Sequence, residues 1–236
     1  IAHMDVAEGE TVKIGTPLFH DKTHEKIFFT SPVSGMVVKI NRGMRRVIEE
    51  VIIRNDSKEV VEDIKVPSVD SSRETILEAL LNSGLFPFFV QRPLARIADP
   101  SDIPRDIFVS LMDTAPLAAA PSMVLAGREK EFISGINVLE KLTSGSVHLS
   151  FGAEDIQLPD LSSIANLERH VFSGPHPAGN VGIQIHHIAP IAGKSDVVWT
   201  CSIKGLLMIG ALFSSGKIDT DVLTAVTGTN ASERHY

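Results

Sequence analysis

The spacing of apolar and polar positions changes along the chain near residue 70. Up to residue 55, apolar positions alternate over short stretches broken by glycines and prolines, as in Ile27–Gly35 and Met36–Ile40; a period of two is typical of β-strands. Beyond residue 73, apolar runs such as Ile107–Met112 alternate with segments of helical period such as Glu129–Leu142. That alternation favours a parallel sheet with crossover helices. The sequence predicts a β domain followed by a Rossmann-like, doubly wound α/β domain.

The boundary between these domains is predicted in a charged, serine-rich segment. Residues 56–73 contain several acidic and serine side chains and Pro67, a composition typical of linkers. We therefore expect a β domain at residues 1–67 and an α/β domain at residues 68–236. The second domain should begin with a helix that Ser72 caps and Gly84 terminates. Val222–Gly228 is expected to be its last strand.

Two short signatures in the first domain indicate a barrel-sandwich hybrid fold. Gly9–Gly15 has the pattern Gly-Glu-x-Val-x-x-Gly and Ser31–Gly35 has the pattern Ser-Pro-x-x-Gly, and both resemble biotinyl- and lipoyl-carrier domains. Such carriers hold their cofactor on a lysine at a hairpin tip. Counting back from the second signature places His24 there, with Lys22 and Lys26 each two residues away. The resemblance thus implies the fold without the attachment chemistry.

Charge and composition exclude several classes of function. A net charge of −7 argues against nucleic-acid binding, which requires a dense basic patch. The single cysteine, Cys201, excludes an internal disulfide and a cysteine-held zinc or iron–sulfur site. Gly174, Gly179 and Gly182 do not have the spacing of a dinucleotide-binding loop, and no Walker-type loop is present. The longest apolar run, Gly205–Phe213, falls short of the ~20 residues that span a bilayer.

Histidines gather in one part of the sequence. His170, His176, His186 and His187 all fall within residues 170–187, which raises the question of a metal site. Few acidic side chains accompany them, and the adjacent His186 and His187 must point apart on any helix or strand. We expect structural or hydrogen-bonding roles for these side chains and no metal ligation.

The same region carries a likeness to a known family. Phe172–Gly179 has the sequence Phe-Ser-Gly-Pro-His-Pro-Ala-Gly and is followed by an apolar segment with His186. This motif resembles the alpha subunit of the sodium-translocating NADH:quinone oxidoreductases of bacterial respiratory membranes. The likeness spans nearly the whole chain in order, through Phe29–Gly35, Ile40–Arg46 and Met112–Ala118. Because the family extends beyond both Ile1 and Tyr236, the resemblance implies a fragment that lacks both termini.

The resemblance implies a place in a respiratory complex. Its members are peripheral subunits on the cytoplasmic side of the bacterial inner membrane, in an enzyme that passes electrons from NADH through flavins and iron to quinone while exporting sodium. By this likeness the chain binds no cofactor itself, docks on other subunits, especially the membrane-embedded B subunit, and contributes to quinone binding. The flavins and iron centres belong to partner subunits. The chain alone is not expected to be catalytically competent.

Two loops are the candidate site for the quinone or for a partner: the first is residues 113–118 and the second is residues 172–179. Both should lie at the carboxyl ends of strands, where open α/β sheets place their ligands. Prolines fix φ and glycines permit turns that side chains forbid, so the second loop is built to hold one shape. For the first loop, a simple capped turn is the alternative. The candidate residues are His176, Pro177, Gly179, Asp113, Thr114 and Pro116.

Two other functions stay open at this point. The β domain could be a scaffold or carrier module that accepts lipoate or biotin at Lys22 or Lys26. Alternatively, the chain could bind flavin, as do the related Rnf protein and the flavin-binding subunit of respiratory complex I. The absence of cluster cysteines and of a phosphate-binding glycine loop argues against this second alternative.

Overall fold

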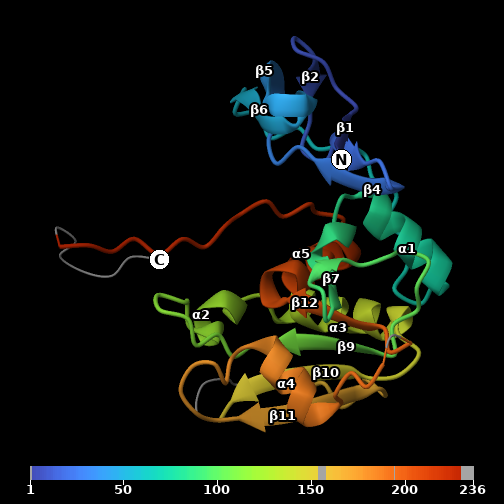
Figure 1. Ribbon diagram of the computed structural model, residues 1–236, viewed down its shortest axis with the longest axis vertical. Helices are drawn as coiled ribbons and strands as arrows, with labels where there is room; N and C mark the ends of the chain where they lie inside the picture. Colours follow the sequence, from blue (N-terminus) through green and yellow to red (C-terminus); the bar gives the residue numbers. More distant parts are fainter. Residues whose placement is uncertain (1, 154–157, 194, 230–236) are drawn as a thin grey trace.

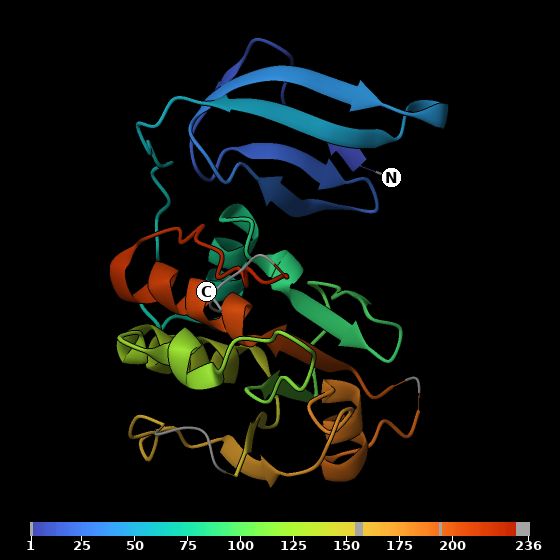
Figure 2. The same cartoon turned by 90° about the vertical axis from the view of Figure 1, so that its left-hand side faces the viewer.

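Two domains follow one another along the long axis of the molecule (Figures 1 and 2). The computed structural model describes residues 2–153, 158–193 and 195–229. The β domain lies at one end and the α/β domain at the other, and the segment between β6 and α1 joins them. The predicted boundary near residue 68 falls within this joining segment. Residues 230–236 of the predicted second domain lie outside the described residues.

The β domain consists of two antiparallel three-stranded sheets, with strand orders β1-β3-β4 and β2-β5-β6. Figure 2 shows them as two layers. Val12, Leu18 and Val37 form the buried core between them, as the alternating pattern predicted. The elements of this domain are β1 (Ala2–Met4), β2 (Thr11–Val12), β3 (Pro17–Asp21), β4 (His24–Thr30), β5 (Gly35–Arg42), the short 3-10 turn η1 (Met44–Arg46) and β6 (Ile48–Asn55).

The hairpin between β3 and β4 differs from the expectation in one respect. Strand pairing closes with Asp21 opposite His24, which leaves Lys22 and Thr23 as the turn. Asp21 stabilises this turn because its Oδ1 accepts hydrogen bonds from the Thr23 amide at 2.9 Å and the Thr23 hydroxyl at 2.7 Å. The placement of His24 at the tip was therefore wrong. Lys22 lies there instead.

The α/β domain is built on a six-stranded sheet of order β11-β10-β9-β12-β7-β8. Its first four strands are parallel, and β7 and β8 are added in antiparallel pairing. The elements are α1 (Arg73–Asn82), η2 (Phe86–Phe88), β7 (Phe89–Arg92), β8 (Arg96–Ile97), β9 (Asp106–Ser110), α2 (Pro121–Leu125), α3 (Glu129–Leu142), β10 (Val147–Gly152), β11 (Leu167–Phe172), α4 (Val181–Ile188), β12 (Val198–Ser202) and α5 (Ile203–Ser215).

Strand β9 shows how helices cover both faces of this sheet. Ile107 and Val109 belong to the main core, which includes residues of α3 and α5. Phe108 points to the opposite face, where it packs with Ile185 of α4. All three strand residues are completely buried. The continuous apolar run therefore marks a strand buried on both sides, and the prediction of a doubly wound sheet is confirmed.

Helices α3 and α5 approach each other at two glycines. A Cβ atom on Gly210 would lie 1.8 Å from the carbonyl oxygen of Glu131, and one on Gly135 would lie 2.5 Å from the carbonyl oxygen of Leu206. Neither position leaves room for a side chain. Glycines inside a helix lower helix propensity, so the presence of Gly135 in α3 and of Gly210 in α5 is explained by this packing.

The β domain shares part of the main core with the α/β domain. Ile14 and Ile27 are buried in the same cluster as Leu85 and Phe86. The joining segment also pairs with the β domain, because Ile14 forms a bridge with Val61. These contacts fix the first domain on the second.

One predicted strand does not form. Val222–Gly228 pairs with no strand of the sheet in the described part of the chain, and the segment extends away from α5 in Figure 1. Val222 is 64% exposed and Val226 is 57% exposed. β-Branched residues favour a strand only where a neighbouring strand and a packing surface exist, so the sequence pattern was misleading here.

We predict that Gly210→Ala destabilises the α/β domain, because its methyl group must displace the backbone of α3. The free energy of unfolding should fall by about 1–3 kcal/mol, measured by urea denaturation. Gly182→Ala in α4 is the matched control, since a Cβ there meets only Asn180 Oδ1 at 3.4 Å. It should leave stability unchanged or raise it by at most about 1 kcal/mol. Equal effects of the two substitutions would contradict the packing explanation.

Candidate functional site

The loop after β9 and the loop after β11 contact each other directly. Thr114 Oγ1 lies 3.0 Å from His176 Nδ1, and the amide of Gly179 donates a hydrogen bond to the same hydroxyl at 3.3 Å. A Cβ atom on Gly179 would lie 2.5 Å from the carbonyl oxygen of Met112. Thus the threonine hydroxyl ties the two loops together, and only glycine permits their close approach.

The other candidate residues lie beside this contact without joining it. Asp113 Oδ1 accepts a hydrogen bond from the amide of Ala115 at 2.9 Å, which is the capped turn that the sequence offered as the alternative. Pro177 supplies the carbonyl that accepts the amide of Asn180 at 2.8 Å. Pro116 and Pro177 are both exposed. Of the six candidates, the structure joins Thr114, His176 and Gly179 through hydrogen bonds.

Helix α4 is held against the sheet by a buried amide that the sequence analysis did not single out. Gln184 is fully buried, and its Nε2 donates to Ser110 Oγ at 3.0 Å and to the carbonyl of Ala178 at 3.4 Å. Asn180 caps the same helix by accepting the Gly182 amide at 3.0 Å. A glutamine flanked by Ile183 and Ile185 in the first half of this helix was the signal that could have identified Gln184.

A hollow of about 460 Å³ opens at the carboxyl ends of β9 and β12. The two loops contribute Asp113 and Gly179 to its wall, and β7 contributes Arg92. The guanidinium of Arg92 carries several N–H donors, and its Nε is buried without a hydrogen-bond partner among the described residues. Sequence reasoning did not identify Arg92 as a site residue, because β7 lies far from both loops in the chain.

Cys201 also contributes to this wall but is almost fully buried. Burial raises the pKa of its thiol to about 12, so the side chain is a neutral, unreactive thiol at physiological pH. We assign it a packing role.

A second hollow, of about 400 Å³, lies between the two domains. Phe29 of β4 and Phe88 of η2 line it together with Lys204 and Met208 of α5. Its wall is mainly apolar. No candidate residue from the sequence analysis lies in it.

The histidines predicted to be structural have separate surroundings. His186 and His187 lie edge to face on α4, with ring centroids 5.4 Å apart. His170 lies on β11 with its Nε2 3.0 Å from His148 Nδ1. Burial lowers the pKa of His170, as does the neighbouring His148, while Glu168 opposes both effects.

A carboxylate close to this histidine pair is strongly stabilised in its charged form. Burial would raise the pKa of Asp106, but hydrogen bonds from His148, Arg105 and the Ser146 amide outweigh burial and lower the pKa to about 2. Arg105 Nε donates to Asp106 Oδ2 at 2.6 Å. Asp106 is therefore ionised at physiological pH.

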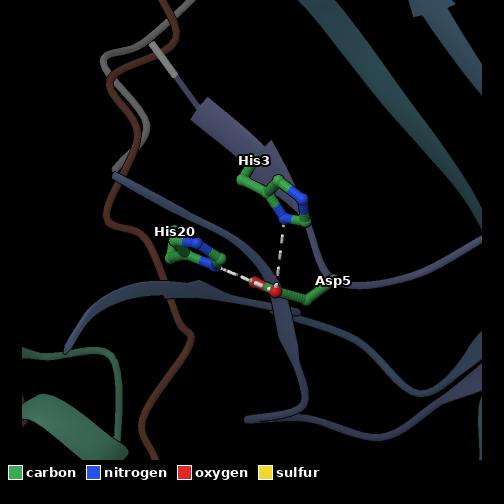
Figure 3. A group of neighbouring side chains, drawn as sticks. All are labelled: His3, Asp5 and His20. Atoms are coloured by element: carbon green, nitrogen blue, oxygen red, sulfur yellow. Dashed lines mark hydrogen bonds and ion pairs between the residues drawn. The ribbon is translucent and has the colours of Figure 1, made fainter. Parts of the chain in front are cut away.

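Another histidine pair lies in the β domain. His20 Nδ1 is 2.9 Å from both carboxylate oxygens of Asp5, and His3 Nδ1 is 3.9 Å from Asp5 Oδ1. Figure 3 shows both rings turned toward the one carboxylate. This group lies at the opposite end of the molecule from the two loops.

No helix in the described part of the chain is long and apolar enough to cross a membrane.

We predict that Thr114→Val separates the two loops, because valine keeps the shape of threonine but loses the shared hydroxyl. The amide of Gly179 should exchange its hydrogen faster, and the free energy of unfolding should fall by about 0.5–1.5 kcal/mol. Hydrogen exchange followed by NMR measures the first effect. Thr114→Ser keeps the hydroxyl and is the matched control. Unchanged Gly179 exchange in Thr114→Val would show that the hydrogen bond does not hold the loops together.

Comparison with known proteins agrees with both parts of this architecture. The family model for the NqrA N-terminal barrel-sandwich hybrid domain matches residues 1–56, and the model for the NqrA second alpha/beta domain matches residues 71–218. The barrel-sandwich hybrid fold of the first domain is thereby confirmed.

Several curated relatives share one name, that of the A subunit of Na(+)-translocating NADH-quinone reductase. The protein from Photorhabdus laumondii is 39% identical over 228 residues, which cover 95% of this chain and 50% of the relative. The protein from Serratia proteamaculans is 39% identical over 98% of this chain and 52% of its own length. The protein from Alcanivorax borkumensis is 37% identical over 97% of this chain and 51% of its own length. The chain thus spans about half the length of these relatives, and it belongs to the NqrA family.

Proposed function

We propose that this chain is part of the peripheral alpha subunit of a Na+-translocating NADH:quinone oxidoreductase and that its two contacting loops form part of the quinone site. The observation that carries the proposal is the hollow beside the loops. Its wall includes apolar side chains of β7, η2 and α4 together with the polar groups of Asp113 and Arg92. The names of the relatives supply the complex to which the chain is assigned.

A quinone headgroup suits this hollow chemically. It is an apolar ring with two carbonyl oxygens, so it needs flat apolar walls and a small number of hydrogen-bond donors. Phe88 and Val181 offer apolar surface, and the buried Nε of Arg92 is a free donor among the described residues. Arg92 lines the hollow, so a ligand carbonyl that accepts a charge-assisted hydrogen bond from its guanidinium would gain affinity.

Thr114 and His176 act as positioning residues in this proposal. Neither lines the hollow, but their contact holds the loops that bring Asp113 and Gly179 to its wall. His176 is exposed, which also leaves it accessible to a neighbouring subunit. We propose that the chain docks on the membrane-embedded subunits, the B subunit in particular, on the cytoplasmic side, with this loop face toward them.

We assign no flavin and no metal-based redox centre to this chain. Electron transfer centres belong to the partner subunits, and the chain's contribution is to bind and orient the quinone. A carrier role for the β domain is less well supported. Lys22 does lie at an exposed hairpin tip, but a carrier domain must move between sites, and Ile14 and Ile27 are buried in the core shared with the second domain.

We predict that His176→Ala in the assembled complex lowers quinone reduction more than it lowers NADH oxidation by an artificial acceptor. The reason is that the substitution loosens the wall of the quinone site without altering the flavin entry site on the partners. Steady-state assays of both activities on the same preparation give the ratio, which should fall several-fold.

His186→Ala is the matched control, because His186 is exposed on α4 and lies outside the loops and the hollow. It should leave the ratio at the wild-type value. Equal loss of both activities in His176→Ala, with the complex intact by gel filtration, would contradict a role in quinone binding. Dissociation of this chain from the complex would instead support docking as the role of the loop.

A further inference from the structure

Three polar side chains project from one face of the sheet at its β10–β11 edge. In the parallel pairing of these strands, His148 lies directly opposite Glu168 and Ser150 lies opposite His170. Residues two apart on a strand share a face. Glu168 and His170 therefore stand side by side on β11, with His148 facing them from β10.

The ligand atoms of these side chains are already spaced like the corners of a metal site. His148 Nδ1 is 3.0 Å from His170 Nε2 and 3.5 Å from Glu168 Oε2, and the latter two atoms are 3.8 Å apart. Bonds of ~2.0–2.1 Å to a tetrahedral zinc ion place its ligand atoms roughly 3.3 Å from one another. A cation can thus enter this triangle with only small side-chain adjustments.

Contacts with neighbouring residues orient the side chains of His148 and Glu168. His148 Nε2 is 3.5 Å from Asp106 Oδ1, and the ring of Phe108 stacks on the His148 ring at 4.4 Å. Glu168 Oε1 accepts a hydrogen bond from Ser146 Oγ at 2.9 Å, which directs its other oxygen toward the histidines. In zinc sites, a ligating histidine usually contacts a carboxylate through its other ring nitrogen, and a ligating carboxylate usually accepts a further hydrogen bond. His148 and Glu168 have these contacts.

The site has a buried side and an open side. The side chain of His148 is 5% exposed, that of His170 is 23% exposed and that of Glu168 is 53% exposed. A cation bound by these three residues would reach solvent past Glu168. Its fourth position is therefore available to water or to another small ligand.

The group of His3, Asp5 and His20 in the β domain differs from this one in how its carboxylate is used. In Figure 3 the ring of His20 faces the carboxylate of Asp5, and both carboxylate oxygens are 2.9 Å from His20 Nδ1. That symmetric pairing occupies the carboxylate, and the side chain of His3 is 57% exposed. We interpret this group as a hydrogen-bonded cluster, and it serves below as the control.

We propose that His148, Glu168 and His170 form a binding site for a zinc-like divalent cation, with one coordination position open to solvent. This differs from the expectation, drawn from the sequence, that His170 is structural. The sequence could not show the site because His148 is far from the other two residues in the chain and only strand pairing brings them together.

The test is a titration of the chain, first stripped with a chelator, with ZnCl2 followed by calorimetry. Cobalt(II) gives a second measurement, since tetrahedral coordination produces visible absorption bands. We expect one high-affinity site per chain.

Because His148 is buried, the test variants are His170→Ala and Glu168→Gln, which alter more exposed side chains of the edge strand. His170→Ala should weaken zinc binding at least about 100-fold, and Asp106→Asn, which removes an outer contact, by about 10- to 100-fold.

His20→Ala is the matched control, since it removes a histidine from the other group and should leave the affinity unchanged. Circular dichroism of each variant establishes that it is folded. The proposal is overturned if the wild-type chain binds no zinc, if folded His170→Ala and Glu168→Gln bind it as well as wild type, or if binding is lost in His20→Ala instead.

Discussion

Burial of β9 on both faces is the constraint on which the rest of the α/β domain depends. Ile107 and Val109 must be covered by α3 and α5, and Phe108 must be covered by α4, because an apolar strand exposed on one face would lose much of its stabilisation. Strand β10 pairs in parallel with both β9 and β11. The carboxyl ends of β9 and β11 therefore lie at the same edge of the sheet.

The candidate site lies at this edge of the sheet. The loops that leave β9 and β11 meet there, and Gly179 allows them to approach to backbone contact. Gln184 and Ser110 then join α4 to the end of β9 below the loops. The face that α4 covers near the centre of the sheet continues toward β10 and β11, where His148 stacks on Phe108 and the proposed cation site lies. Both proposed sites therefore depend on the same packed strand.

Much of the fold was predictable from local patterns. Helix α3 has the predicted bounds, Ser72 caps α1 as expected, and β9 is the predicted buried strand, because each pattern is reinforced by its own tertiary packing. Val222–Gly228 has strand-forming residues but joins no sheet in the described part of the chain. The candidate loops were recognisable from glycine, proline and sequence position. Arg92 and His148 were not, since their significance depends on strand order and register, which one sequence does not reveal.

We propose that a quinone binds beside the two loops. The most direct measurement is photolabelling of the assembled complex with a short-chain photoreactive quinone, followed by mass spectrometry of the labelled peptides. We expect label within residues 87–92, 110–117 or 174–181, and we expect unlabelled quinone to compete with it. Label confined to the interdomain hollow around Phe29 and Met208, or found only on partner subunits, would contradict it.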